Sequence, residues 1–94
     1  MKAVWKFPLR VASLQKISMP KNSTLLTVQM EVVQMRGQHL CLWALIDSDK
    51  EVEDRFIAIA DTGAQVPENT IRYIGTFQIP EREFVGHVFE VKGE

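Results

Sequence analysis

The sequence predicts an all-β domain: a small, mainly antiparallel β-sandwich or open barrel of six to seven strands. Apolar and polar residues alternate with a period of two over several short stretches, which is typical of half-buried strands. Glycine, proline, asparagine and aspartate residues separate these stretches at short intervals. No stretch convincingly follows the 3.6-residue period of an amphipathic helix. A chain of 94 residues is large enough for one core, so we expect a single β-domain over residues 1–94.

The first part of the chain predicts two short strands. Residues Ala3–Leu9 alternate, with Trp5 and Phe7 expected to point inward. Pro8 indicates an edge strand, because proline donates no hydrogen bond to a neighbouring strand. A brief strand over Gln15–Met19 follows; the alternative is a helix over residues 11–16, which is short and has no capping residue.

The middle of the chain contains the longest regular stretch, Thr24–Gln34. One parity carries apolar side chains that we expect to face the core: Leu26, Val28, Met30 and Val32. A hairpin turn is predicted over Met35–Gln38, around Gly37. The next strand, His39–Ile46, is apolar on both parities, which indicates a central strand or an oligomer interface.

The last part of the chain predicts three more strands: Arg55–Ala60, residues 71–79, and Phe84–Val91. A charged loop over Asp47–Asp54 precedes them, and a turn over Pro80–Glu83 precedes the last. In Phe84–Val91 one parity comprises Val85, His87, Phe89 and Val91. For residues 71–79 the pattern leaves open which parity faces inward, and therefore which side chains a ligand could reach.

Composition excludes several classes of protein. Hydrophobic residues make up 46% and charged residues 24%, as in ordinary globular domains. A net charge of -1 makes nucleic acid an unlikely partner, because phosphate binding needs an excess of Lys and Arg. No apolar run approaches the ~20 residues of a membrane span. A single cysteine, Cys41, forms no internal disulfide, and the first residues do not resemble a signal peptide. We therefore expect a cytoplasmic protein that has no membrane contact.

The sequence contains no complete catalytic or metal site. Ile59–Ala64 matches the hydrophobic-x-Asp-Thr-Gly-Ala signature of retroviral-type aspartic proteases, but too little chain follows it for a flap and the later glycine segment. Cys41 lies among apolar residues, as core cysteines do. His39 and His87 have no clustered ligands for zinc, and we interpret His87 as a hydrogen-bonded structural residue. The acidic loop lacks the central glycine of an EF-hand. We expect no enzyme, no metal and no cofactor.

The candidate binding site lies in the long polar loop after Asp61 and in the aromatic strand that follows it. Gly63 permits a positive φ and Pro67 interrupts regular pairing, so this loop is irregular and exposes backbone amides. Amides beside an arginine and a tyrosine can hold an anionic or planar ligand. The candidate residues are Thr62, Gly63, Gln65, Arg72 and Tyr73. The alternative is that this loop only connects two strands.

Several segments together resemble a family of small phage and prophage proteins of unknown function. They span nearly the whole chain: Val4–Leu9, Ile17–Pro20, Leu26–Gln29, Leu40–Leu45, Thr62–Pro67, Arg72–Gln78 and His87–Glu90. The resemblance implies a viral origin and a setting in the host cytoplasm, and it implies no activity.

The expected function combines these observations. We expect a non-enzymatic homo-oligomer that binds a small anionic ligand, such as a nucleotide immune signal of the host, and so acts as a counter-defence sponge. The alternative is a protein-interaction module that inhibits or adapts a host or phage protein through an edge strand or an apolar patch around Trp43.

Overall fold

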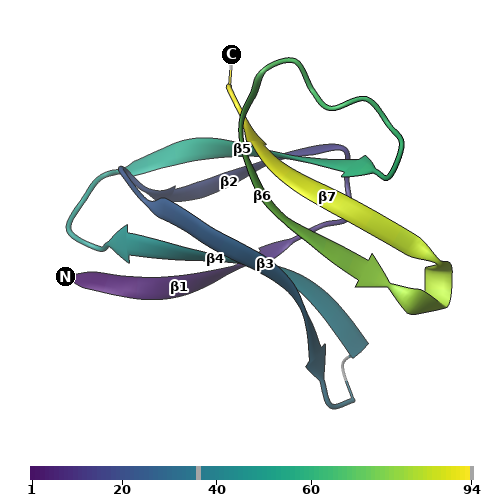
Figure 1. Cartoon of the computed structure of the whole chain (residues 1–94). Helices are drawn as coiled ribbons and strands as arrows, with labels where there is room; N and C mark the ends of the chain where they lie inside the picture. Colours follow the sequence, from purple (N-terminus) through teal and green to yellow (C-terminus); the bar gives the residue numbers. More distant parts are fainter. Residues whose placement is uncertain (36, 94) are drawn as a thin grey trace.

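The computed structural model of the chain describes residues 1–35 and 37–93. Within these residues seven strands form two antiparallel sheets that pack on one another (Figure 1). The elements are β1 (Lys2–Leu9), β2 (Leu14–Pro20), β3 (Thr24–Val33), β4 (Gly37–Asp47), β5 (Val52–Asp61), β6 (Thr70–Ile79), the 3-10 helix η1 (Pro80–Arg82) and β7 (Phe84–Val91). This arrangement confirms the predicted all-β class, in the form of a small sandwich.

The two sheets have different sizes. The three-stranded sheet has the order β1-β4-β3, and the four-stranded sheet has the order β2-β5-β7-β6. β1 is an edge strand, as Pro8 predicted, and β4 is central, as its apolar sequence predicted. The chain passes between the sheets after β1, β2 and β4. Three connections remain within one sheet: the β3–β4 hairpin, the loop that joins the parallel strands β5 and β6 across β7, and the β6–β7 connection through η1.

The core lies between the sheets and draws on both. Leu42 of β4, Ile57 of β5 and Val88 of β7 have no exposed surface. Successive side chains of a strand point to opposite faces, so each sheet has an inner face toward the core and an outer face away from it. The other buried core residues are Leu9, Met19, Leu25, Val28, Leu40, Ala44, Ile46, Ile59, Phe77 and Ile79.

A bulge in β3 corrects the predicted inner face of that strand. Leu25 lies opposite Ala44 and Thr27 lies opposite Trp43, so Leu26 is an extra residue without a partner. The extra residue changes the parity, because a one-residue shift moves a side chain to the other face. Leu25 is therefore buried, and Leu26, which was predicted to be buried, is 46% exposed.

Two further predicted core residues are exposed for a different reason. Val32 and Trp5 have the inward parity, but their exposed fractions are 73% and 43%. Trp5 lies on the edge strand β1, and Val32 lies near the end of the edge strand β3. The opposite sheet does not cover either position, so the prediction that they are buried is wrong although the parity is right.

Two bulges in β6 settle which of its side chains point inward. Ile71 and Ile74 are the extra residues, because the register against β7 shifts at both positions. Phe77 and Ile79 are buried, as expected of the inward parity after the second bulge. Before that bulge the parity is reversed, so Tyr73 points outward although it shares the sequence parity of Phe77.

The turns are shorter than the sequence suggested. β4 and β5 are joined by residues 48–51 alone and belong to different sheets, so the charged loop predicted over Asp47–Asp54 is a short connection between the sheets, and its ends belong to strands. Residues 11–16 contain the start of β2 and no helix. The turn predicted around Gly37 includes Arg36, which lies outside the described residues. Among those described, no helix is long and apolar enough to cross a membrane.

A buried ion pair links the strands of the four-stranded sheet. Glu90 of β7 is 3% exposed, and its carboxylate accepts a hydrogen bond from Nε of Arg55 on β5 at 2.6 Å. Arg55 also donates from Nη1 to the backbone oxygen of Ser23, in the turn between β2 and β3, at 3.0 Å. Removing one partner of such a pair leaves an uncompensated buried charge, which costs about 3–5 kcal/mol.

The position of the core on β4 yields a test with a control on the same strand. Leu42→Ala should lower the free energy of unfolding by about 2–5 kcal/mol, because it removes a fully buried side chain. Leu45→Ala, at a position on the outer face that is 39% exposed, should cost less than about 1 kcal/mol. Denaturant unfolding measures both; equal losses would contradict the assignment of faces.

Candidate functional site

The predicted loop leaves β5 through a tight turn. The amide of Ala64 donates to the backbone oxygen of Asp61 at 3.0 Å, which closes a four-residue turn. Gly63 has a φ of +89°, a conformation that glycine adopts without strain at the third position of such a turn. The loop then remains exposed through residues 62–66 and arches between the parallel strands β5 and β6 (Figure 1). The conformation of this turn is therefore sufficient to explain why residue 63 is a glycine.

A hydrogen-bonded chain connects this loop to the outer face of the four-stranded sheet. Thr62 Oγ1 lies 2.7 Å from Nε2 of His87, in β7. The other ring nitrogen of His87, Nδ1, lies 2.9 Å from Oγ1 of Thr76, in β6. Thr76 Oγ1 is also bonded to the phenol oxygen of Tyr73. We call Thr62, His87, Thr76 and Tyr73 the polar chain.

The strand geometry explains why these four side chains meet. His87 lies beside Thr76 in the β6–β7 register and points outward, because its neighbour Val88 points into the core. The bulge at Ile74 places Tyr73 and Thr76 on the same face although they are three residues apart. The Tyr73 ring packs edge-on against Phe89, with centroids 5.6 Å apart, and its side chain remains well exposed.

Arg72 points to the opposite face of the sheet. It lies opposite Glu90 in the register, whereas Tyr73 lies opposite Phe89. Its Nε atom is 3.5 Å from the carboxylate of Glu90, the same carboxylate that binds Arg55 more closely. Of the five predicted residues, Thr62 and Tyr73 are therefore brought together, Gly63 and Gln65 stand in the exposed loop beside them, and Arg72 is separated from the polar chain.

The candidate site predicted from the sequence did not include His87 and Thr76. The interpretation of His87 as a hydrogen-bonded residue is confirmed, because both of its ring nitrogens contact hydroxyl groups. Thr76 was given no role. The parity of Phe84–Val91 did place His87 and Phe89 on one face. The pairing of β7 with both β5 and β6, which brings His87 under the loop, has no local signal in the sequence.

The polar chain presents hydrogen-bonding groups at the surface. Both ring nitrogens of His87 contact hydroxyl groups. In residues 1–35 and 37–93, no group of three His, Cys, Asp or Glu side chains is placed to hold a metal ion. The site offers hydroxyl and imidazole hydrogen-bonding groups beside an exposed aromatic ring, and such groups orient a small ligand.

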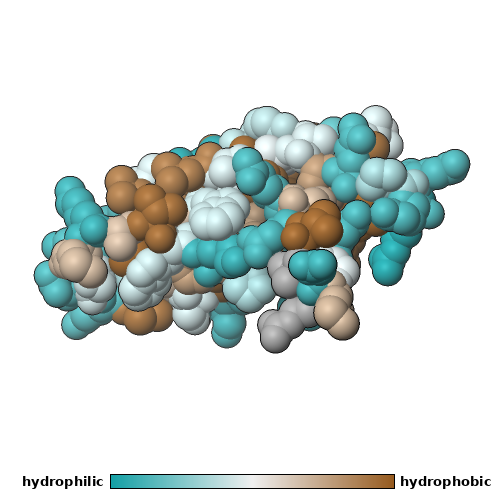
Figure 2. Space-filling model, turned by 90° about the horizontal axis from the view of Figure 1, so that it is seen from below, coloured by the Kyte–Doolittle hydropathy of each residue, from teal (hydrophilic) through white to brown (hydrophobic). Residues whose placement is uncertain are grey.

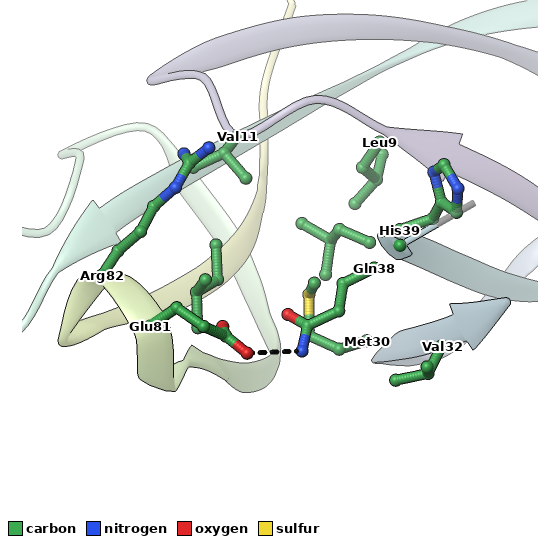
Figure 3. Close-up of a pocket in the computed structure, with 11 residues that line it drawn as sticks. Leu9, Val11, Met30, Val32, Gln38, His39, Glu81 and Arg82 are labelled. Atoms are coloured by element: carbon green, nitrogen blue, oxygen red, sulfur yellow. Dashed lines mark hydrogen bonds between the residues drawn. The ribbon is translucent and has the colours of Figure 1, made fainter. Parts of the chain in front are cut away.

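A separate groove lies at the end of the sandwich near η1. It has a volume of about 620 Å³, within the range of small-molecule sites. Leu9, Leu40 and Ile79 form its apolar floor. Gln38 Nε2 donates to Glu81 Oε1 at 3.1 Å, and Figure 3 shows these two side chains meeting at the groove. Its polar rim carries both signs of charge, on Glu81 and Arg82.

The patch predicted around Trp43 lies on the outer face of the three-stranded sheet. Val4 and Leu45 lie opposite one another there, with exposed fractions of 55% and 39%. Trp43 itself is half-buried: Lys6 Nζ lies 5.7 Å from its ring centroid and binds Glu31 at 2.9 Å. Figure 2 views the molecule from below Figure 1, and its hydrophobic atoms gather mostly toward the end that carries the amino terminus.

The protein is a small β-sandwich domain with a chain of hydrogen-bonded side chains on the outer face of one sheet. The chain belongs to the family described as a domain of unknown function, DUF7352, whose sequence profile matches residues 1–94. No curated protein and no solved structure matches the chain.

The surroundings of Cys41 predict an unreactive thiol. Cys41 is 4% exposed, and burial raises the pKa of its thiol, with the Glu31 carboxylate acting in the same direction and Lys6 against it. Because the thiolate is the reactive form, a disulfide reagent should modify the folded protein very slowly at neutral pH and faster as the pH rises. The reaction should become fast in denaturant. Rapid modification of the folded protein would show that this side chain is accessible.

The polar chain predicts that His87 holds the loop in place. His87→Ala removes the hydrogen bond of His87 with Thr62 and its hydrogen bond with Thr76, so the turn should open more often. Amide hydrogen exchange of Ala64, which donates to Asp61, should accelerate severalfold. The matched control is His39→Ala, because His39 is an exposed histidine of the other sheet. Unchanged exchange at Ala64 would mean that the loop is held by other contacts.

Proposed function

We propose that the protein is a non-enzymatic, self-associating binding domain that holds a small anionic ligand between the loop 62–69 and the outer face of β6 and β7. The observation that supports this proposal is the polar chain itself. It joins Thr62 and Tyr73, two residues expected at the site, through His87 and Thr76. A hydrogen-bonded surface next to an exposed aromatic ring suits a ligand that is planar on one side and polar on the other.

Each part of the site has a role in this proposal. The Tyr73 ring stacks on the planar part of the ligand, as aromatic side chains do with bases. The hydroxyl of Thr62 and the imidazole of His87 exchange their mutual hydrogen bond for bonds to the ligand. The amides of Gly63 and Gln65 contact the anionic group, since neither has a backbone acceptor in the described part of the chain.

Arg72 supplies positive charge from the β6 edge and makes no contact with the polar chain. Its guanidinium shares the Glu90 carboxylate with Arg55, and the Arg55 bond is the shorter, at 2.6 Å against 3.5 Å. The side chain of Arg72 is 47% exposed. Its charge is therefore only partly compensated, and it attracts an anion approaching along this edge.

The resemblance to phage and prophage proteins provides a biological setting for the proposal. In the cytoplasm of an infected host, a binder of this kind sequesters a nucleotide immune signal without degrading it. The free, buried Cys41 fits a reducing compartment. Sequestration requires only affinity and abundance, which a small non-enzymatic domain can provide.

A second candidate function is a protein-interaction module. Val4 and Leu45 are exposed side by side over the half-buried Trp43, and exposed apolar groups of this kind occur at binding surfaces. This surface is on the other sheet from the polar chain, so mutations separate the two functions.

The test is native mass spectrometry of the protein with a panel of cyclic and ADP-ribose-type nucleotides. The proposal predicts a stoichiometric gain of unmodified ligand mass. Tyr73→Ala should weaken binding by about tenfold or more, because stacking of a base on an aromatic ring contributes about 1–3 kcal/mol. Thr62→Ala should weaken binding as well, through loss of a ligand hydrogen bond.

The control is Thr24→Ala, which removes an exposed threonine of the other sheet. It should leave the affinity unchanged. Binding that persists in Thr62→Ala and Arg72→Ala would show that the ligand lies elsewhere, and amide chemical shifts would then distinguish the groove near η1. The interaction module is the better account under two conditions. The protein binds no nucleotide, and it captures a host protein that the Leu45→Arg variant does not capture.

A further inference from the structure

The four edge strands of the two sheets differ in how open they are to a further strand. β1 carries Pro8, which cannot donate to a neighbour. β3 is interrupted by the bulge at Leu26, and β6 by the bulges at Ile71 and Ile74. Such features normally prevent edge-to-edge pairing. β2 pairs with β5 from Leu14 to Pro20 without any shift of register. Among the described residues, β2 is the one edge strand that has no bulge and no proline before its last residue, Pro20.

The backbone groups that β2 directs outward follow from its pairing with β5. Ser13 accepts a hydrogen bond from Ile59 at 3.2 Å, and Lys21 donates to Glu51 at 2.7 Å. In an antiparallel ladder every second residue bonds to the partner, so the odd-numbered residues of β2 face β5. The amides of Leu14, Lys16 and Ser18 therefore point to the open edge, and no backbone acceptor for them occurs within the described chain.

We propose that β2 pairs with β2 of a second copy, in antiparallel orientation about a two-fold axis at Ile17. This pairing joins the two four-stranded sheets into one continuous sheet. Lys16 of each copy then lies opposite Ser18 of the other, and these two residues exchange both backbone hydrogen bonds. Leu14 lies opposite Pro20, which has no amide to donate and whose backbone oxygen already accepts a hydrogen bond from the buried Ser23 hydroxyl. The two Lys16–Ser18 pairs together give four hydrogen bonds.

The charges on this edge favour that register. A shift that placed the axis at Lys16 would bring two lysines directly opposite each other, which is unfavourable. With the axis at Ile17, Lys16 of one copy lies beside Ser18 of the other, and Ser18 donates to Asp54 at 2.9 Å. Each lysine thus approaches the carboxylate of the other copy's Asp54, in addition to its contact of 3.8 Å within its own chain.

The apolar residues on this edge are also self-complementary. Leu14 and Val52 are 58% and 64% exposed, at opposite ends of the β2–β5 pair. Val52 lies beside Pro20, and the two-fold axis brings Leu14 of the second copy to the other side of Pro20. Val52 of one copy and Leu14 of the other therefore lie on the same face, on either side of Pro20 and about 10 Å apart, which is two strand spacings.

The inference deepens the self-association in the proposed function and does not depend on the ligand. Its test uses the full chain without ligand. Sedimentation equilibrium over a wide concentration range should show a dimer. Ser18→Pro removes an amide that points to the open edge and leaves every β2–β5 hydrogen bond in place, so it should give a folded monomer. Ser18→Ala is the matched control: it loses the same hydroxyl contact with Asp54, keeps the amide and should remain dimeric.

A charge exchange tests the register. K16E should weaken dimerisation by about tenfold, because Glu then lies on the same face as Asp54 of the other copy, one strand beyond Ser18, and repels it. D54K should do the same, and the K16E/D54K double variant should restore the dimer. Circular dichroism confirms that each variant is folded.

A monomeric unmodified protein, or a dimer that Ser18→Pro leaves intact, would overturn the proposal. If Ser18→Pro disrupts the dimer but K16E and D54K do not weaken it, then β2 pairs with β2 in a different register from the one proposed. A protein that dimerises as described but binds no nucleotide would contradict the proposed function and not the proposed β2–β2 pairing.

Discussion

Unpaired strand edges are the constraint on which the rest of this structure depends. Two small sheets that do not close into a barrel leave four outer strands, and each has backbone groups that a neighbour could pair with. Proline on β1 and bulges on β3 and β6 interrupt three of these edges. A regular β2 leaves the fourth edge available, and its charges and exposed apolar residues match those of a second copy.

The same bulges determine which side chains reach the surface. In β6 the bulge at Ile74 turns Tyr73 to the outer face, where it meets Thr76. Without it, Tyr73 would share the buried face of Phe77 and the polar chain would lose its aromatic end. A feature that protects an edge from unwanted pairing thus also builds the candidate binding surface, and Arg72 is turned toward Glu90 as a consequence.

Sequence periodicity was sufficient for the fold class and for the location of every strand described. Pro8 and the apolar run of β4 even predicted edge and central positions. The prediction that Leu26 is buried was wrong because a bulge adds one residue to β3, and the alternation of apolar and polar residues does not reveal this extra residue. The same prediction for Trp5 and Val32 was wrong because burial there depends on how far the opposite sheet extends.

The candidate site was predictable only in part. Thr62 and Tyr73 were expected because turn and aromatic residues have local signals. Their link through His87 depends on the pairing of β7 with two strands that are distant in sequence. The position of Arg72 depends on a bulge and on the buried Arg55–Glu90 pair. Interactions of this kind are set by tertiary pairing, so one sequence does not reveal them.

The most direct test of the β2 edge is amide hydrogen exchange at single-residue resolution, measured as a function of protein concentration. The amides of Gln15 and Ile17 bond to β5 and should be protected at every concentration. Those of Lys16 and Ser18 should exchange rapidly in dilute protein and become protected as the dimer forms. Rapid exchange of Lys16 and Ser18 at high concentration, with Gln15 and Ile17 still protected, would contradict pairing through this edge.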